Sequence, residues 1–356
     1  MTQHFHFEVK SVDGHARLGR LRTSHAVVET PIFMPVGTLA AVKSQTPSEV
    51  TETGAHVILA NTYHLWLRPG AERVAALGGI QRFMAWPHAV LTDSGGYQVF
   101  SLAKLRDIND EGVSFRSHLD GELKFLTPEK ALEIQGLLGS DIAMVLDECP
   151  PANAERFVIE AAMQRTTAWA RRSLQVAERE GQVRFGIVQG GTHCDLRLAH
   201  LNDIAAMPFA GIALGGFSVG EPPEKMHELL VEIGPCMPKD RPRYLMGVGT
   251  PRDLLIAIGA GIDMFDCVLP TRNGRNAQAF TWNGTLNLNN ARHREDSSPL
   301  DSRCACPVCQ TYSRAYLRHL FNVGEMLGPR LVTQHNLHFY GALMKGAREA
   351  IAAGVY

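Results

Sequence analysis

The chain has 356 residues, 45% of them hydrophobic and 20% charged, a composition typical of a globular protein with a large core. This excludes a disordered, collagen-like or coiled-coil protein, and no apolar run reaches the roughly 18 residues of a membrane span. Seven cysteines is an odd number, and three crowd into residues 304–309, which argues against a secreted disulfide framework. The N-terminal segment lacks the apolar core of a signal peptide, so we expect a cytoplasmic protein without membrane contact.

The charge is balanced over the whole chain but not along it. The formal net charge is −1, which gives no indication of a polyanionic partner. Between Arg272 and Arg330, however, there are eight arginines, no lysine and four acidic residues. Arginine suits bidentate contacts with phosphates or base edges, although an ordinary solvated surface has the same composition. Charge alone does not decide between the two interpretations.

Eight short apolar runs follow one another along the chain, and each ends in small or polar residues. Their hydrophobicity is continuous rather than alternating, which is typical of parallel strands buried on both faces. The runs are residues 31–37, 57–63, 89–95, 142–148, 185–190, 211–216, 244–249 and 264–270.

Helical patterns separate these runs. Thr127 and Pro128 are an N-cap and a first-turn proline for a helix that runs to Leu138, and the pairs at 221–222 and 250–251 repeat this start. A longer helical pattern covers residues 154–180. Strands alternating with helices predict an α/β fold, an irregular (β/α)8 TIM barrel. The competing doubly wound sheet is disfavoured because no Gly-x-Gly-x-x-Gly turn follows a first strand.

The alternation is interrupted twice. Residues 98–126 resemble hairpin strands with a turn at 118–121, and residues 271–312 predict strands and turns rather than a helix. Helical patterns over 311–321 and 332–353 close the chain.

The second interruption contains a group of cysteines. Cys304, Cys306 and Cys309 lie in a polar loop, and three thiolates at this spacing indicate a structural zinc site. The other explanation is three unbound thiols clustered by chance. Tetrahedral zinc needs a fourth ligand, and a histidine from the neighbouring segments is the expected one. We choose His335; the alternatives are His293, His319 and His338.

Two regions are expected from these patterns. Residues 1–270 are predicted to form the barrel with the catalytic strand ends. Residues 271–356 are predicted to form an inserted zinc-binding subdomain and a C-terminal helical region packed on the barrel.

In a barrel of this kind, chemistry takes place where the strands end. The small or polar residues at the predicted strand ends are Asp93, Asp147, Gln189, Gly215, Gly216 and Asp266. A single aspartate at such a place could instead cap the following helix or pair with an arginine. This explanation is weaker for Asp266, because burying an unpaired charge within an apolar run is costly and points to a functional role.

Several long motifs resemble those of the bacterial tRNA-guanine transglycosylases (queuine tRNA-ribosyltransferases). The resemblance stays in register from about residue 5 to residue 350. The motifs are Asp-Ser-Gly-Gly-Tyr-Gln at 93–98, Val-Leu-Asp-Glu-Cys at 145–149, the glycine pair at 190–191, Gly-Gly-Phe-Ser-Val-Gly-Glu at 215–221, Leu-Met-Gly-Val-Gly at 245–249, residues 265–276, and the set Cys304, Cys306, Cys309 and His335.

The resemblance implies an irregular (β/α)8 barrel with a zinc subdomain that holds one structural Zn²⁺ per chain. It also implies exchange of the wobble guanine for 7-aminomethyl-7-deazaguanine in tRNAs with GUN anticodons, those for Asp, Asn, His and Tyr, on the queuosine pathway. The exchange would be a double displacement through a covalent enzyme–tRNA intermediate. The implied partners are the tRNA anticodon loop, the two bases and a second copy of the chain.

Individual roles follow position by position from the resemblance. Asp266 matches the family's nucleophile and Asp93 its general acid/base. Asp147, Gln189 and Gly216 would hold the edge of the purine, and Tyr97 and Met246 would cover its two faces. Val219 would form one wall of the pocket. Arg272 and Arg275 would contact the neighbouring bases of the anticodon loop. Elementary chemistry agrees, since a carboxylate is a good bidentate acceptor for guanine's N1–H and exocyclic amine, and another can form a ribosyl ester.

Three positions depart from the family pattern. Phe217 stands where relatives usually carry leucine, Ala277 replaces a usual glycine, and the chain stops at Tyr356, earlier than typical relatives. These departures put the pocket shape beside Gly216 and the conformation after Arg275 in question.

Other functions have to be weighed against this one. Cys149 and Val219 match the bacterial subgroup, and a β-branched wall leaves less room than glycine for the bulky base queuine. The alternatives within the family are an archaeosine- or queuine-type enzyme and a catalytically silent RNA-binding subunit. Outside it, a small-molecule glycosidase could use Asp93 and Asp266, but the zinc module and the arginine-rich flank would then have no evident purpose.

Overall fold

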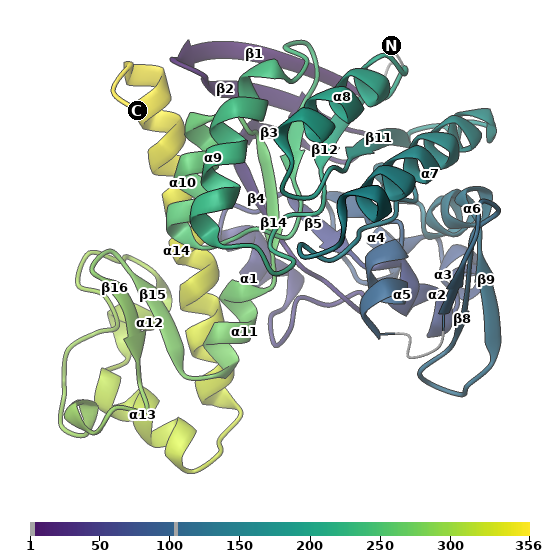
Figure 1. Ribbon diagram of the computed structural model, residues 1–356. Coiled ribbons are helices and arrows are strands. Elements are labelled where there is room, and N and C mark those ends of the chain that lie inside the picture. The colour runs from purple at the N-terminus through teal and green to yellow at the C-terminus, as the bar shows by residue number, and fades with distance from the viewer. Residues whose placement is uncertain (1–3, 103–105) are drawn as a thin grey trace.

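All eight predicted strands are present and form one parallel sheet. The structure is a computed structural model that describes residues 4–102 and 106–356. The strands are β4 (Ile32–Pro35), β5 (Val57–Ala60), β6 (Ala89–Thr92), β10 (Ile142–Met144), β11 (Val183–Val188), β12 (Gly211–Leu214), β13 (Arg243–Leu245) and β14 (Met264–Cys267). Their order is β4-β14-β13-β12-β11-β10-β6-β5, and Gly37 N donates to Leu59 O at 2.6 Å where β4 meets β5. The predicted (β/α)8 barrel is therefore confirmed (Figure 1).

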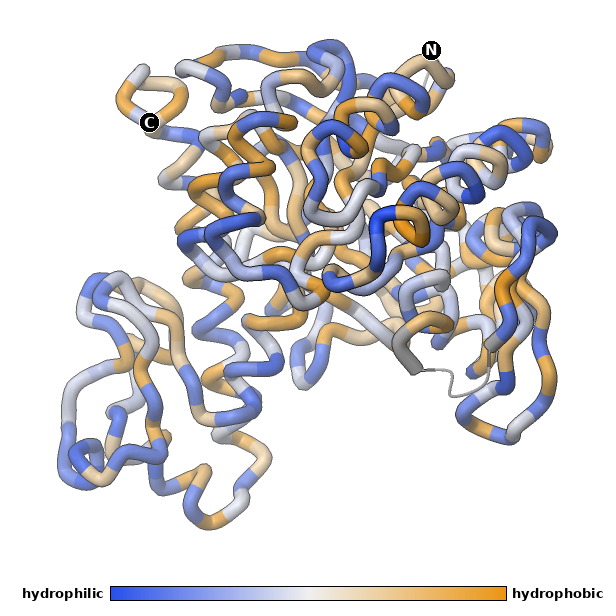
Figure 2. The backbone as a smooth tube through the Cα atoms, viewed as in Figure 1, coloured by the Kyte–Doolittle hydropathy of each residue, from blue (hydrophilic) through white to orange (hydrophobic). Residues whose placement is uncertain are grey.

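Burial explains why the strand sequences are continuously apolar. Every residue of β4, β5, β6, β10, β12, β13 and β14 is buried, because one face of each strand fills the barrel and the other contacts helices. Figure 2 shows hydrophobic residues along the central strands and hydrophilic residues on the outer helices. The barrel interior is thus a packed core, and space for a ligand is left only at the strand ends.

The helices surround the sheet. Those of the barrel are α1 (Pro47–Glu52), α2 (Thr62–Leu67), α3 (Ala71–Ala76), α4 (Ile80–Phe83), α5 (Gly96–Leu102), α6 (Pro128–Leu138), α7 (Arg156–Gln175), α8 (Cys194–Ala205), α9 (Pro223–Ile233), α10 (Pro251–Gly259) and α11 (Leu269–Arg275). Thr127 and Thr250 cap α6 and α10 through their hydroxyl groups, as predicted. In the part of the chain that the structure describes, none of the helices has both the length and the apolar character needed to cross a bilayer.

One predicted helix is shorter than expected. The pattern over 154–180 becomes α7, which ends at Gln175. Arg184 on β11 donates from Nη1 to Ser173 O at 2.7 Å and to Val176 O at 2.8 Å, so this distant side chain satisfies carbonyls at the helix end. Sequence periodicity carries no information about such a contact.

The segment after residue 270 begins differently from its prediction. Its first residues belong to α11, so Arg272 and Arg275 lie on a short helix rather than in a loop. Two of the predicted strands follow as β15 (Gln278–Thr281) and β16 (Gly284–Asn287), which pair antiparallel. The helix predicted over 311–321 is present as α13 (Arg314–Asn322), which begins where the hydroxyl of Ser313 accepts from Tyr316 N. A short helix that was not predicted, α12 (Pro307–Thr311), precedes it.

Two small antiparallel sheets flank the barrel. Strands β7 (Arg106–Ile108), β8 (Val113–Arg116) and β9 (Leu123–Leu126) confirm the predicted hairpin material, with the turn at 118–121 between β8 and β9, although α5 occupies the start of that segment. The sheet of β1 (His6–Asp13), β2 (Ala16–Arg22) and β3 (Val27–Thr30) was not predicted. It is tied to the barrel by Arg17, whose Nε donates to Asp263 at 3.1 Å just before β14.

The C-terminal helix α14 (Leu327–Ala353) joins the two regions. Its later residues, among them Tyr340 and Met344, belong to the barrel core, whereas Leu331 and Val332 belong to a second core with β15, β16, α12 and α13. Figure 1 shows that second group projecting from the barrel, with α14 running between the two. Ala277 lies in the second core at a φ of +61°, so the backbone keeps a left-handed conformation despite the replacement of glycine.

The ion pair beneath β14 generates the first testable prediction. Asp263 is fully buried, pairs with the buried Arg17, and also accepts from Arg243 N at 2.7 Å. Asp263→Asn should lower the free energy of unfolding by about 3–5 kcal/mol, because a buried guanidinium loses its counter-charge. Denaturant titration measures this. Lys10→Ala, which breaks an exposed pair with Glu29, is the control and should cost under about 1 kcal/mol; equal losses would contradict the prediction.

Candidate active site

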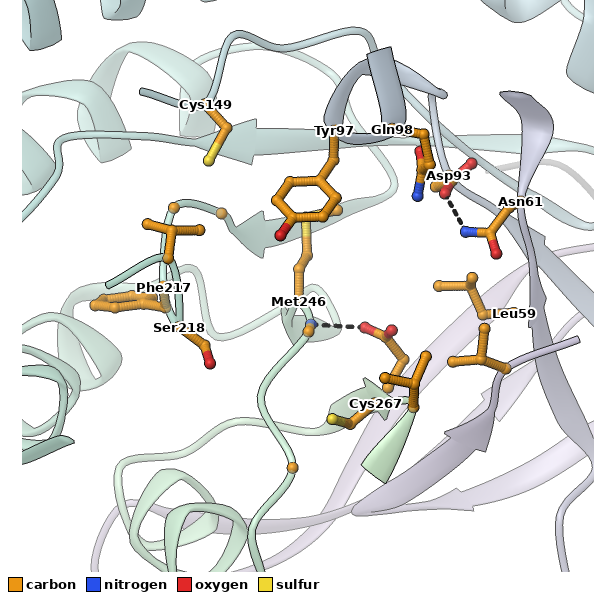
Figure 3. Close-up of a pocket in the computed structure, with 18 of the residues that line it drawn as sticks. Leu59, Asn61, Asp93, Tyr97, Gln98, Cys149, Phe217, Ser218, Met246 and Cys267 are labelled. Atoms are coloured by element: carbon orange, nitrogen blue, oxygen red, sulfur yellow. Dashed lines mark hydrogen bonds between the residues drawn. The ribbon is translucent and has the colours of Figure 1, made fainter. Parts of the chain in front are cut away.

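A cavity of about 510 Å³ opens where the barrel strands end. Figure 3 shows Cys149 and Phe217 at one end of it and Asn61 with Asp93 at the other. The predicted site residues that line it are Asp93, Tyr97, Asp147, Gln189, Gly216, Val219, Met246, Asp266 and Arg272. Arg275 is not among its lining residues in the described part of the chain; its Nε donates to Thr271 O within α11.

Asp93 follows β6 and is held by residues that follow β5. Thr62 N donates to Asp93 Oδ1 at 2.8 Å, and the Asn61 side-chain amide donates to Oδ2. Burial raises the pKa of Asp93 to about 6 even though these hydrogen bonds favour its charged form. A carboxyl group with a pKa near neutrality can both accept and return a proton.

Asp147 follows β10 and contacts Gln189 at the end of β11. Gln189 Nε2 donates to Asp147 Oδ2 at 2.6 Å, and the Gln189 backbone N–H donates to His200 Nδ1 at 2.8 Å. Burial raises the pKa of Asp147 to about 6, and the charge of Asp93 contributes in the same direction. The Gln189 side chain also contacts the Cys149 thiol, and its Oε1 is buried without a hydrogen-bond partner among the described residues.

Asp266 lies within β14, and both of its hydrogen bonds fall on one oxygen. Tyr244 Oη donates to Asp266 Oδ1 at 2.5 Å, and Gly247 N donates to the same atom at 2.8 Å. Burial raises the pKa of Asp266, while these two hydrogen bonds oppose the rise. Oδ2 accepts none of the hydrogen bonds found among the described residues, so it is the oxygen available to a substrate.

Three residues that donate hydrogen bonds to these aspartates were not predicted from the sequence: Asn61, Thr62 and Tyr244. Asn61 and Thr62 end a predicted strand, so the rule that selected the aspartates could have found them. Tyr244 gave no such signal, because its contact with Asp266 depends on the pairing of β13 with β14.

The backbone beside Gln189 requires glycine. Gly216 has a φ of +66°, and a Cβ there would lie 2.4 Å from Gln189 Oε1. The next residue, Phe217, is buried, and its ring centroid lies 3.7 Å from the guanidinium carbon of Arg197. The phenylalanine that departs from the family pattern therefore covers a buried cation as well as lining the cavity.

The predicted cysteine group is assembled in the second core. Ligand atoms of Cys304, Cys306, Cys309 and His335 all lie within 4.8 Å of one another. His335 Nδ1 is 3.3 Å from Cys309 Sγ, and Nε2 is 2.8 Å from Phe280 O, which fixes the Nε2–H tautomer and leaves Nδ1 for a metal. The four residues therefore form a possible metal-binding group with His335 as its histidine.

The helix that carries His335 also positions α11. Asn336 Nδ2 donates to Pro270 O at 3.0 Å, and Phe280 N donates to Asn336 Oδ1 at 2.9 Å. Gly274 allows close packing, since a Cβ there would lie 2.7 Å from Thr333. The metal-binding group and the arginine-bearing helix are thus connected through adjacent residues of α14.

Fold and cavity together define the class of protein: a (β/α)8-barrel enzyme with buried carboxyl groups at the strand ends. The sequence model described as queuine tRNA-ribosyltransferase matches residues 13–356, and the chain belongs to this family. A protein of that name from Sorangium cellulosum is 60% identical over 356 residues, which cover 100% of this chain and 90% of the relative. Two further proteins of that name are each 54% identical to this chain. The one from Desulforamulus reducens matches 97% of this chain and 93% of its own length, and the one from Novosphingobium aromaticivorans matches 98% and 95%.

The raised pKa of Asp147 predicts how stability depends on pH. Above pH 6 the Asp147 carboxyl group is ionised in the folded protein, although its pKa is higher there than in the unfolded chain. This difference in pKa lowers the free energy of unfolding by about 3 kcal/mol. Asp147→Asn should remove this cost, so the variant should be more stable than the wild type at pH 7.5.

The advantage should fall as the pH drops through 6 towards 4, because the wild-type carboxyl group then becomes neutral as well. Urea titration of both proteins at each pH measures the difference. The exposed Asp240→Asn is the control and should change stability little at any pH. An Asp147→Asn advantage that does not decline with falling pH would contradict the prediction.

Proposed function

We propose that this protein exchanges the wobble guanine of GUN-anticodon tRNAs for 7-aminomethyl-7-deazaguanine, in queuosine biosynthesis. The observation that carries the proposal is one cavity lined by three buried carboxyl groups, those of Asp93, Asp147 and Asp266, in a chain of this family. Group transfer by double displacement needs a nucleophile, a proton carrier and a means of holding the base, and one carboxyl group serves each purpose.

Asp147, Gln189 and Gly216 hold the base by its edge. The carboxylate of Asp147 accepts from N1–H and the exocyclic amine, while the side-chain amide of Gln189 and the backbone N–H of Gly216 donate to O6. Tyr97 and Met246 cover the two faces, and both line the cavity. The ring of Tyr97 is half-exposed at the cavity, where it can cover one face of the base.

Asp266 Oδ2 attacks C1′ of the target ribose. The C1′–N9 bond breaks, its electron pair leaves with the guanine, and an Oδ2–C1′ ester forms. Asp93 supplies the proton that the departing base needs and later removes one from the incoming base. The incoming nitrogen then attacks C1′ and releases the Asp266 carboxylate, which restores the enzyme.

Two features set the choice of base and of tRNA. Val219 narrows the cavity where a 7-substituent projects, which favours the aminomethyl base over queuine. Arg272 lines the cavity from α11, and Arg275 lies one turn further along the same helix, where both can contact bases next to the target. Incorporation of queuine as efficient as that of the aminomethyl base would instead support a queuine-type enzyme.

The metal of the Cys304, Cys306, Cys309 and His335 group is proposed to be one structural Zn²⁺ per chain. Three thiolates and one imidazole match zinc's preferred ligands and leave no position open for substrate. When bound, the ion stabilises the core that holds α14. We further propose that the chain acts as a cytoplasmic homodimer, since one modest basic surface is small for holding an anticodon arm.

Metal content and stability test the zinc assignment. Cys306→Ala should reduce bound zinc from one equivalent per chain and lower the melting temperature, with exchange activity lost as a consequence, because folding and metal binding are coupled. Elemental analysis and thermal unfolding measure this. Cys236→Ala, at an exposed cysteine outside the group, should change neither. Full stability and activity after complete removal of zinc would contradict a structural role.

The proposed activity is tested by labelled guanine incorporation and by trapping the intermediate. Wild-type protein should incorporate labelled guanine into unmodified tRNA and form an adduct that survives denaturing gels. Asp266→Asn should lose both, because the amide cannot form the ester. Asp93→Asn should still bind tRNA but turn over about 10²–10⁴-fold more slowly. An adduct on Asp93, or one that persists in Asp266→Asn, would reverse the two roles.

A further inference from the structure

Arg197 on α8 is a fully buried cation immediately behind the cavity wall. Its Nη1 donates to Gly215 O at 2.9 Å, its Nη2 to Gly216 O at 2.9 Å and its Nε to Gly191 O at 2.7 Å. The ring of Phe217 covers the guanidinium. The side chain therefore donates to three carbonyl groups from two neighbouring strand ends and has no exposed surface.

Arg197 forms no direct ion pair with a described residue, although the charge of Glu221 is near enough to favour its charged form. Burial lowers its pKa to about 9, so the group remains charged at neutral pH. Burying a charge is costly unless it is fully hydrogen-bonded, and a neutral side chain would fill the same space at lower cost. The packing of Arg197 also requires glycine at position 190, since a Cβ there would lie 2.6 Å from Arg197 Cγ.

The position of the charge relative to one peptide group suggests its purpose. Arg197 Nη1 donates to the carbonyl oxygen of Gly215, and in a trans peptide the N–H of the next residue, Gly216, points the opposite way; Gly216 lines the cavity. Donation to a carbonyl strengthens the N–H of the same peptide as a donor, because hydrogen bonds in a chain polarise one another. A charged donor in a dry environment has the largest such effect.

We propose that Arg197 is a positioning residue that holds and polarises the Gly215–Gly216 peptide, so that its N–H stabilises negative charge on O6 of the departing base. This inference rests on the proposed function. When the C1′–N9 bond breaks, the electron pair stays with the guanine and spreads over the ring to O6 while Asp266 Oδ2 bonds to C1′. A donor that is held in place and polarised favours this charge more than it favours the neutral bound base.

Single-turnover release of labelled guanine from tRNA tests the proposal. Arg197→Lys keeps the charge but cannot reach three carbonyl groups in a fixed fork, and it should slow release roughly 10- to 100-fold with an unchanged Kd for tRNA. Arg243→Lys is the matched control, because Arg243 is also buried and donates to the carbonyls of Met237, Pro238 and Gly261 before β13 and β14, away from the cavity. It should lower the melting temperature comparably and leave the release rate unchanged.

Competition between free guanine and 6-thioguanine gives a readout that a purely structural role would not change. Sulfur is the weaker acceptor, so Arg197→Lys should reduce the wild-type preference for guanine over 6-thioguanine, and Arg243→Lys should preserve it. Unchanged release in Arg197→Lys, equal slowing in both variants, or an unchanged base preference would overturn the proposal.

If Arg197→Lys does not fold, the preference of the wild-type protein for guanine over 6-thioguanine tests the proposal. At least tenfold weaker binding of 6-thioguanine supports recognition of charge at O6, and equal binding of the two bases overturns the proposal. Failure of the wild type to release guanine at all would instead refute the proposed function itself.

Discussion

The structure depends on one constraint: eight strands run parallel in a closed sheet, so the carboxyl ends of all of them meet on the same rim. Asp93, Asp147 and Asp266 come from three different strands and are more than 170 residues apart at the extremes, yet they line one cavity. None of them forms an ion pair with a cation among the described residues; amide, hydroxyl and backbone donors hold them instead. Their raised pKa values follow directly from this arrangement.

The close approach of backbone segments around Gln189 is the second consequence of the barrel geometry. Glycine at 190, 215 and 216 brings α8 and two strand ends within hydrogen-bonding distance of one another. This leaves space behind the cavity wall for the guanidinium of Arg197, and the cavity lies in front of the wall. One side of the same peptide segment is therefore occupied by a charge, and the other is free for a ligand.

The C-terminal helix connects this site to the region outside the barrel. On α14, His335 belongs to the metal-binding group, Asn336 holds the ends of α11 and β15, and Tyr340 Oη donates to Gly249 O at the cavity side of the barrel. A rigid helix with contacts in both cores keeps the arginines of α11 in a fixed position relative to Asp266. The possible metal-binding group is thus connected to α11 and to the cavity side of the barrel through one element.

The sequence by itself determined the eight strands, their barrel arrangement and the residues at the strand ends, because buried parallel strands and helix caps depend on local composition and spacing. It also determined the three cysteines of the metal-binding group, since they are close in sequence, whereas the structure brings His335, the histidine chosen among four, next to them. Only the tertiary structure decided where α7 ends, that Arg272 and Arg275 lie on a helix, and that β1–β3 form a sheet against the barrel. It also decided that Tyr244 orients Asp266 and that Arg197 lies behind Gly216. Each of these depends on contacts between residues distant in the chain, which local periodicity does not record.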